Sequence, residues 1–412
     1  MRIRRFSSLH SCIRPMNGQA ANLSFSASSE TVSEGLYGMY NDDGVIVEQP
    51  VRSGANDLKK RPHRHQQQQP KKEETECCTG CCMFCKLCGL LCHVACPPIP
   101  ELITRKMAFH PIKRGKTYNL VGTDAKSGET VRLNSAKNAK NMTSLLLEPV
   151  PLDYFRRDDY DWINENGSTL SVKTKLGNRL VCYWIDAPEL EDSQRGNENK
   201  VIIFSQPNSS DIGSFLQPNS MSVKALSNKF AVEMVFYDYS GYGYSTGSPS
   251  EKNIYADIEA VYECVRERKG SDVEIILMGF SMGTAASIDL ASRNPPNLIG
   301  VVLFAPFTSA LRLMQGRPDR NDPLCLDRFL SLDKAPKISV PTLIIHGFKD
   351  DVVPLSHGIA LHNRLMYPVE PLFLERGTHM NIVNTLYGSV MKRVIHFINN
   401  ETLTPNSGRG EE

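Results

Sequence analysis

Apolar runs of strand length recur along the second half of the chain, separated by segments long enough to form helices. Continuous apolar runs are typical of strands that are buried on both faces, and their alternation with helices is typical of a parallel sheet. We therefore predict an α/β fold in which helices cover both faces of a mostly parallel sheet. The predicted strands are VIIFS (201–205), VEMVFYDY (232–239), VEIILMGF (273–280), IGVVLFAP (299–306), PTLIIHG (341–347) and PLFLE (371–375).

Two local patterns add detail to this sheet. Residues 250–268 have the period of an amphipathic helix, with Ser250 where an N-cap is expected. Such a helix would cross over right-handedly between two parallel strands. Upstream, LSVKTKLGNRLVCYWI predicts a hairpin that turns at Gly177-Asn178. The buried side of the helix would carry Ile254, Ile258, Val261 and Val265.

The regular pattern is confined to residues 105–400, which we interpret as one globular domain. Residues 1–76 are polar and include the run RPHRHQQQQPKKEE, so they cannot bury enough surface to offset the entropy of ordering. We predict a disordered arm there and a disordered tail at 401–412. Residues 1–29 also have the composition of a mitochondrial transit peptide, but they lack the apolar core of a secretory signal. The sequence favours a chain that faces the cytosol.

The cysteines are concentrated in one apolar segment, 77–100. Eight of the twelve cysteines lie between positions 77 and 96, and prolines end the segment. On a helix their three- and four-residue steps would form a stripe interleaved with Met83, Phe84 and Leu87. Several acyl chains on such a stripe would attach the chain firmly to a membrane surface. We therefore predict a membrane-anchoring segment acylated at Cys77, Cys78, Cys81, Cys82, Cys85, Cys88, Cys92 and Cys96.

Other interpretations of this cluster are weaker. The cysteines of 82–92 have the spacing of an iron–sulfur run, but no second motif accompanies them. Zinc ribbons separate their two CxxC pairs by about a dozen residues or more, a spacer that this segment lacks. A transmembrane span is the structural alternative, and Lys86 with two glycines disfavours it. We expect no metal and no other cofactor.

The charged residues are nearly balanced. There are 47 Lys and Arg against 45 Asp and Glu, for a formal net charge of +2. A surface built for nucleic acid would carry a clear excess of positive charge. We therefore expect no nucleic-acid partner.

The pattern G-x-S-x-G occurs at 279–283, between a predicted strand and a predicted helix. A serine there stands on a turn so tight that side chains two residues away would clash, which explains both glycines. The turn presents Ser281 at the end of the strand, where the N–H of Met282 and the helix dipole can stabilise an oxyanion. Ser281 is the candidate nucleophile.

A serine hydroxyl is a poor nucleophile unless a base and an orienting carboxylate assist it, and with this motif they follow in the order Ser, acid, His. Asp350 stands just past the predicted strand 341–347, and His379 lies in the loop after the next strand. Loops at one edge of a parallel sheet can bring the three side chains together. Asp350 is preferred over Asp351 because it fits the spacing HGxxD.

The other histidines of this region receive structural interpretations. His346 precedes a glycine at a strand end and is interpreted as a turn residue. His357 and His362 fall on the following predicted helix, where we expect them to face solvent.

These segments belong to a longer resemblance. Across about residues 77–400 the chain resembles the alpha/beta-hydrolase domain-containing protein 17 family of serine depalmitoylases. The resemblance implies an alpha/beta-hydrolase fold with an eight-stranded, mostly parallel sheet, and it puts Ser281, Asp350 and His379 at the family's triad. The matching segments are PNSSDIGSF, YDYSGYGYSTGSPSEKNIYADIEAVY, GFSMGTAASIDLASR, APFTSALRL, LIIHGFKDDVVPLSHGIAL and VEPLFLERGTHMNI.

The resemblance also implies a substrate and a cellular location. Members of the family remove palmitate from cysteine side chains, and their N-terminal cysteine cluster is itself palmitoylated, in agreement with the predicted anchor. The expected partners are S-palmitoylated peripheral membrane proteins and the membrane surface. The expected location is the cytosolic face of cellular membranes, the plasma membrane and endosomes among them.

One departure from the family concerns the oxyanion loop. The family has His-Gly-Asn-Ala where this chain has Gln206-Pro207-Asn208-Ser209. Because proline has no N–H, the donor that complements Met282 would come from Asn208 or Ser209. Losing one donor costs about 3 kcal/mol of transition-state stabilisation. Two alternatives remain: a lipid or other carboxyl esterase, because an oxygen ester calls for the same triad, and, owing to Gln206-Pro207, a catalytically weak, membrane-tethered interaction protein.

Overall fold

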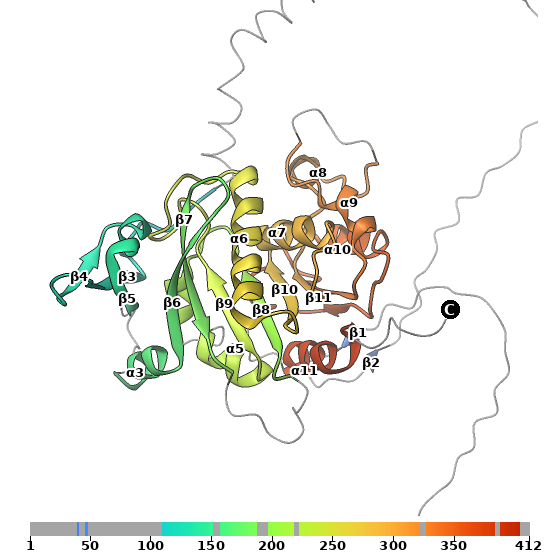
Figure 1. Ribbon diagram of the computed structural model, residues 1–412. Coiled ribbons are helices and arrows are strands. Elements are labelled where there is room, and N and C mark those ends of the chain that lie inside the picture. Colours follow the sequence, from blue (N-terminus) through green and yellow to red (C-terminus); the bar gives the residue numbers. More distant parts are fainter. Residues whose placement is uncertain are drawn as a thin grey trace, which may run out of the picture. The chain divides into compact units, whose positions relative to one another are not determined.

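The computed structural model describes residues 39–40, 46–47, 109–150, 157–187, 197–217, 222–321, 327–383 and 388–403 (Figure 1). These residues all belong to one unit of the chain, Tyr37–Glu412. The predicted anchor at 77–100 lies outside the described residues, as do most of the arm 1–76 and of the tail 401–412.

Eight strands form the central sheet, and the six from β8 to β13 run parallel. Their spatial order is β6-β7-β9-β8-β10-β11-β12-β13, with β7 antiparallel to β9 and β6 antiparallel to β7. Two short strands, β1 (Met39–Tyr40) and β2 (Ile46–Val47), extend the β13 edge. The predicted alpha/beta-hydrolase fold is confirmed. The eight strands are β6 (Gly167–Lys173), β7 (Arg179–Ile185), β8 (Lys200–Ser205), β9 (Glu233–Tyr237), β10 (Glu274–Phe280), β11 (Leu298–Phe304), β12 (Thr342–Gly347) and β13 (Leu372–Leu374).

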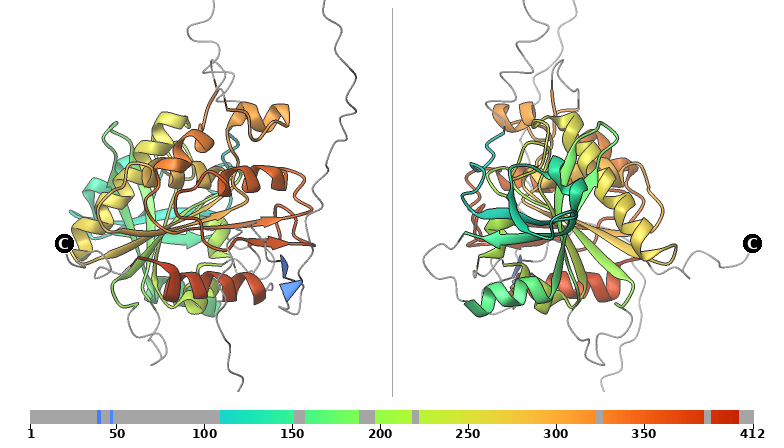
Figure 2. Two further views of the ribbon diagram at one scale, coloured as in Figure 1. Left: turned by 90° about the vertical axis from the view of Figure 1, so that its right-hand side faces the viewer. Right: turned by 60° about the vertical axis from the view of Figure 1, so that its left-hand side comes forward.

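Alternate residues of a central strand pack against opposite layers of helices. Val201 and Ile203 of β8 belong to one apolar cluster, and Ile202 and Phe204 belong to the other. This period of two buries both faces of the strand, which explains its continuous apolar sequence. Figure 2 shows helices on both sides of the sheet. One layer contains α6 (Glu251–Lys269), α7 (Met282–Ala291) and α10 (Leu355–His362), and the other contains α5 (Val223–Phe230) and α11 (Gly388–His396).

The two local predictions are confirmed. Helix α6 begins after Ser250, whose side-chain oxygen accepts the Asn253 N–H at 3.1 Å. All four of its predicted inward residues are buried. Strands β6 and β7 form the hairpin, in which the Thr174 N–H donates to the Asn178 carbonyl at 2.8 Å.

A second, antiparallel sheet precedes the hairpin, in the order β4-β3-β5. The apolar pattern does not predict it, because most residues of β4 are exposed and give no periodic signal. Tyr118, Leu120 and Leu147 nevertheless join the apolar cluster under the main sheet. The remaining elements are β3 (Tyr118–Asp124), β4 (Thr130–Leu133), β5 (Met142–Pro149), α3 (Arg157–Glu165), α4 (Ile212–Leu216) and the short helical turns η1 (Ala136–Asn141), η3 (Ala335–Lys337) and η4 (Phe397–Glu401).

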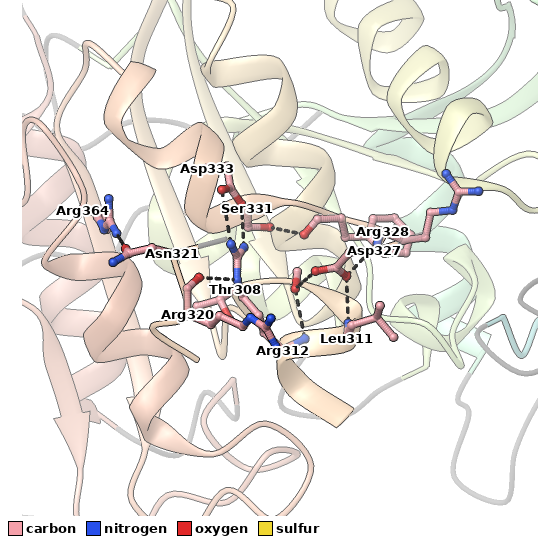
Figure 3. A network of polar contacts seen from close by, with 12 residues as sticks. Thr308, Leu311, Arg312, Arg320, Asn321, Asp327, Arg328, Ser331, Asp333 and Arg364 are labelled. Atoms are coloured by element: carbon pink, nitrogen blue, oxygen red, sulfur yellow. Dashed lines mark hydrogen bonds and ion pairs between the residues drawn. The ribbon is translucent and has the colours of Figure 1, made fainter. Parts of the chain in front are cut away.

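Between β11 and β12 the chain leaves the sheet and forms α8 (Ala310–Gln315) and α9 (Ser331–Lys334). The buried guanidinium of Arg312 binds Asp333 through both terminal nitrogens, at 2.6 and 3.2 Å (Figure 3). Its Nε donates to the Arg320 carbonyl at 2.9 Å. A planar guanidinium satisfied on three sides fixes α8 against α9.

Replacing Arg312 tests whether its ion pair with Asp333 stabilises the fold. We expect Arg312→Ala to lower the free energy of unfolding by about 3 kcal/mol, because it leaves the Asp333 carboxylate without its buried partner. The matched control is Arg293→Ala, since the Arg293 side chain is 40% exposed and its ion pairs lie at the surface. There we expect a loss of less than about 1 kcal/mol. Equal losses in urea unfolding would contradict the assignment.

Candidate active site

Ser281 occupies the turn between β10 and α7 in a backbone conformation that residues with side chains rarely adopt. Its φ is 52° and its ψ is −116°. Such strain persists only where the surroundings determine it. The Ser281 N–H donates to the Phe304 carbonyl of β11 at 2.9 Å, and the Ser281 carbonyl accepts the Thr284 N–H at 3.0 Å and its hydroxyl at 2.6 Å. These bonds hold the serine at the carboxyl end of the sheet.

The two glycines of the motif are required by backbone contacts. A Cβ on Gly279 would collide with the carbonyl of Gly283, the second residue of α7. A Cβ on Gly283 would collide with the Ser205 carbonyl at the end of β8. The second contact places the start of the oxyanion loop directly against the nucleophile helix.

The structure brings Ser281, His379 and Asp350 into one hydrogen-bonded chain. The Ser281 Oγ lies 3.0 Å from His379 Nε2, and His379 Nδ1 lies 2.8 Å from Asp350 Oδ2. The Phe280 ring packs against the imidazole, with 5.3 Å between ring centroids. This geometry allows His379 to take the serine proton while the carboxylate fixes its orientation.

Backbone contacts also join the loop of the acid to the loop of the histidine. The Phe348 N–H donates to the Leu374 carbonyl at 2.9 Å, and the Lys349 N–H donates to the Gly377 carbonyl at 2.8 Å. A Cβ on Gly347 would collide with Gly377. The two loops therefore form one unit at the ends of β12 and β13.

Asp350 is buried and held by several donors. Its Oδ1 accepts the N–H groups of Val352 at 3.0 Å and of Val353 at 2.7 Å. Burial acts to raise the pKa of Asp350, but hydrogen bonds from His346, His379 and Val353 outweigh it and hold the pKa below its usual range. The carboxylate is therefore charged at neutral pH. Its neighbour Asp351 is exposed.

The oxyanion loop after β8 is held by side chains from several elements. The Tyr239 hydroxyl donates to the Gln206 carbonyl at 2.6 Å. The Asn208 Oδ1 accepts the Tyr242 hydroxyl at 2.7 Å and the His110 N–H at 3.0 Å. Met282 begins α7 and is buried, whereas Ser209 is exposed. Of the two candidates for the second donor, Asn208 has the more firmly held side chain.

The sequence analysis missed Asp238, which lies beneath this loop. Its Oδ1 accepts from Gln206 Nε2 at 3.2 Å and from the Ile212 N–H at 2.8 Å, while its Oδ2 accepts the Tyr118 hydroxyl at 2.5 Å. Burial, together with the charge of a neighbouring aspartate, raises the pKa of Asp238 to about 7. Gly243 leaves room for this carboxylate, because its φ is 47° and a Cβ there would collide with Asp238 Oδ2.

Three of the histidines differ from their predicted positions. His346 lies within β12 with its ring buried, rather than in a turn. The prediction that His357 faces solvent is wrong, because its side chain is fully buried. His362, which was also expected to face solvent, is half-buried. Helix α10 is too short for the apolar period to show which side packs inward.

The described residues contain neither a metal-binding cluster nor a membrane-spanning helix. Within them, no group of three or more His, Cys, Asp and Glu side chains is arranged to hold a metal ion. No helix in the described ranges is long and apolar enough to cross a membrane. The eight clustered cysteines lie outside those ranges.

The nucleophile follows β10, the acid follows β12 and the histidine follows β13, on a mostly parallel sheet. This order defines the serine-hydrolase class of alpha/beta hydrolases, and comparisons with known proteins agree. The Hydrolase_4 family model, described as serine aminopeptidase S33, matches residues 223–318. Human alpha/beta hydrolase domain-containing protein 17B is 34% identical over 322 residues, which cover 77% of this chain and 97% of that protein. The chain belongs to the alpha/beta hydrolase domain-containing protein 17 family.

A second relative and a solved structure are also similar to this chain. Alpha/beta hydrolase domain-containing protein 17C of Xenopus tropicalis is 35% identical over 331 residues, which cover 78% of this chain and 96% of that protein. Among solved structures, the esterase Pf2001 of Pyrococcus furiosus is 17% identical with a TM-score of 0.46, and the match covers 60% of this chain and 96% of that one.

The two adjacent aspartates provide a sharp test of the site. We expect Asp350→Asn to lower kcat for a p-nitrophenyl ester by about 10⁴-fold, because an amide would favour the wrong tautomer of His379. Asp351→Asn should leave kcat nearly unchanged, since that side chain is exposed. Circular dichroism of both variants controls for folding. The reverse ranking would show that Asp351 is the catalytic acid.

Proposed function

We propose that the protein is a membrane-associated serine thioesterase that removes palmitate from S-acylated cysteines of proteins. The observation that carries the proposal is the hydrogen-bonded chain from Ser281 through His379 to Asp350, with Ser281 on a strained turn. Strain of this kind is characteristic of functional positions. The resemblance described from the sequence adds the palmitoyl-cysteine substrate.

Acylation begins when Ser281 attacks the thioester carbonyl. His379 Nε2 takes the serine proton as the Oγ–carbon bond forms, and Asp350 stabilises the resulting imidazolium. The carbonyl electrons move onto oxygen, where the Met282 N–H and a donor from the loop at Asn208 stabilise the charge. The tetrahedral intermediate then collapses, the carbon–sulfur bond breaks, and the cysteine leaves as a thiolate. The product is an acyl-serine.

Deacylation repeats these steps with water as the nucleophile. His379 returns its first proton to the departing thiolate and is then free to take a proton from water. The hydroxide attacks the acyl-serine carbonyl, and His379 protonates Ser281 as the carbon–oxygen bond breaks. The fatty acid leaves and the triad is restored. An oxygen ester would follow the same course, so the triad alone does not distinguish a thioesterase from a lipid esterase.

The position at which the N-terminal segment meets the hydrolase domain supports action at a membrane surface. The His110 N–H donates to the Asn208 side chain of the oxyanion loop at 3.0 Å, so the N-terminal segment joins the domain beside the active site. Twelve residues separate Cys96 from Phe109, so the two can lie at most about 45 Å apart. An anchor in the cysteine segment would therefore keep the active site near the bilayer, where acylated proteins are bound.

The nucleophile can be tested directly. We expect Ser281→Ala to fold normally while its hydrolysis of an S-palmitoyl-cysteine peptide falls by about 10⁶-fold, because no other group forms the acyl intermediate. The rate is measured with the full-length protein in detergent micelles, and labelling by a fluorophosphonate probe should also disappear. Turnover like that of the wild type would refute the mechanism.

The same assay separates the proposal from its alternatives. A glycerolipid of equal chain length serves as the competing substrate for the wild-type protein. A higher kcat/KM for the peptide supports the thioesterase, and a higher value for the glycerolipid favours a lipid esterase. Absence of probe labelling in folded wild-type protein would favour the interaction protein.

Membrane attachment should be separable from catalysis. We expect replacement of all eight clustered cysteines by serine to release the protein into the soluble fraction, because each buried acyl methylene contributes about 0.8 kcal/mol to binding. The variant should still cleave a soluble thioester. Hydroxylamine, which cleaves thioesters, should likewise release the wild-type protein from membranes. Protein that stays bound after complete deacylation would refute the lipid anchor and favour a transmembrane span.

A further inference from the structure

Two buried histidines lie behind the catalytic carboxylate, and the mechanism described above uses neither. His346 belongs to β12 and His357 belongs to α10, and both side chains are fully buried. His346 Nε2 lies 3.4 Å from Asp350 Oδ2, the same oxygen that faces His379. His346 is therefore the nearest ionisable neighbour of the catalytic acid on the side away from His379.

The partners of His346 determine where its ring carries a proton. Its Nε2 lies 2.8 Å from the Val353 carbonyl oxygen. A carbonyl can only accept, so Nε2 must be the donor. The same nitrogen lies 3.4 Å from Asp350 Oδ2. In the neutral ring, Nδ1 is then an acceptor.

The partners of His357 lead to the same tautomer. Its Nδ1 accepts the Thr308 N–H at 3.3 Å and lies 2.9 Å from the Thr308 hydroxyl oxygen. A backbone N–H can only donate, so Nδ1 carries no proton and Nε2 carries one. Burial, and next the charge of His346, lower the pKa of His357 to about 4, which keeps this ring neutral at pH 7.

The two ring nitrogens that have no hydrogen-bond partner are a complementary donor and acceptor. Among the described residues, neither His346 Nδ1 nor His357 Nε2 has a hydrogen-bond partner, and both atoms are buried. One is an acceptor and the other is a donor. A buried polar atom without a hydrogen-bond partner lowers the stability of the fold. Both atoms gain a partner if the donor nitrogen and the acceptor nitrogen are joined by hydrogen bonding. Gly358 makes room beside the acceptor, because a Cβ there would lie 2.5 Å from His346 Nδ1.

We propose that one buried water joins the two rings, accepting from His357 Nε2–H and donating to His346 Nδ1, and that His346 thereby positions the catalytic carboxylate. The inference rests on the proposed function, because Asp350 must act in the triad for its position to affect turnover. A continuous chain then runs from Thr308 at the end of β11, through both rings, to Asp350 and His379. His346 and His357 are positioning residues in this arrangement and do not touch the substrate.

Kinetics of paired variants test the positioning role. We expect His346→Leu to lower kcat for a soluble thioester on the order of tenfold with KM unchanged, because the carboxylate loses one of its fixed donors. His346→Gln, which keeps a side-chain N–H, should restore most of the rate. His362→Leu, at the end of α10, is the control and should behave as the wild type. A wild-type kcat in His346→Leu would overturn the proposal.

A double-mutant cycle tests whether His357 acts through His346. His357→Leu alone should lower kcat, whereas in the His346→Leu background it should have no further effect. Losses that multiply would show that the two rings act independently, which would overturn the proposed pair.

Nuclear magnetic resonance gives a readout that does not depend on turnover. In the Ser281→Ala protein, ¹⁵N-histidine spectra should show the Nε2–H tautomer for both rings, with the His357 proton protected from solvent exchange. A proton on His357 Nδ1, or rapid exchange, would overturn the pair. If the wild-type protein cleaves no thioester, the proposed function fails while this spectrum still decides the inference.

Discussion

The active site depends on one backbone contact, between the nucleophile helix and the first parallel strand. Gly283 of α7 touches the Ser205 carbonyl of β8 so closely that no side chain fits between them. The contact brings the oxyanion loop against the turn that carries Ser281. It also leaves Ser281 no relaxed conformation, because its N–H and its carbonyl are bound to β11 and to the helix. The strain of the turn is thus determined by packing on both sides of it.

A similar glycine contact joins the loops that carry Asp350 and His379. Gly347 ends β12 and meets Gly377 in the loop after β13. Asp350 and His379 are therefore presented by two loops that are joined through their backbones. The candidate triad consists of three side chains, while glycines far apart in the sequence bring the loops that carry them together. The rigidity of the site comes from the ends of the parallel strands.

Much of the fold was predictable from the sequence because the determining interactions are local. The buried strands show as apolar runs, α6 shows as a periodic pattern with an N-cap, and the nucleophile turn shows as paired glycines. The β3–β5 sheet was not predictable, because most residues of β4 are exposed and few residues of β5 are buried. The burial of His357 and the role of Asp238 depend on neighbours from distant segments, which a single sequence does not reveal. The catalytic roles of Ser281, Asp350 and His379 stay predictions, although the structure brings the three residues together.

Two buried carboxylates beside the site show how their surroundings determine charge. Asp350 and Asp238 both lie out of solvent, and burial acts to raise the pKa of each. Around Asp350, donors from two backbone amides and two imidazoles outweigh burial, so the carboxylate stays charged and can orient His379. Around Asp238, a neighbouring aspartate adds to the effect of burial and the pKa rises instead. The group beneath the oxyanion loop therefore approaches neutrality at pH 7, and its hydrogen bonds fix the loop without placing a full negative charge near the developing oxyanion.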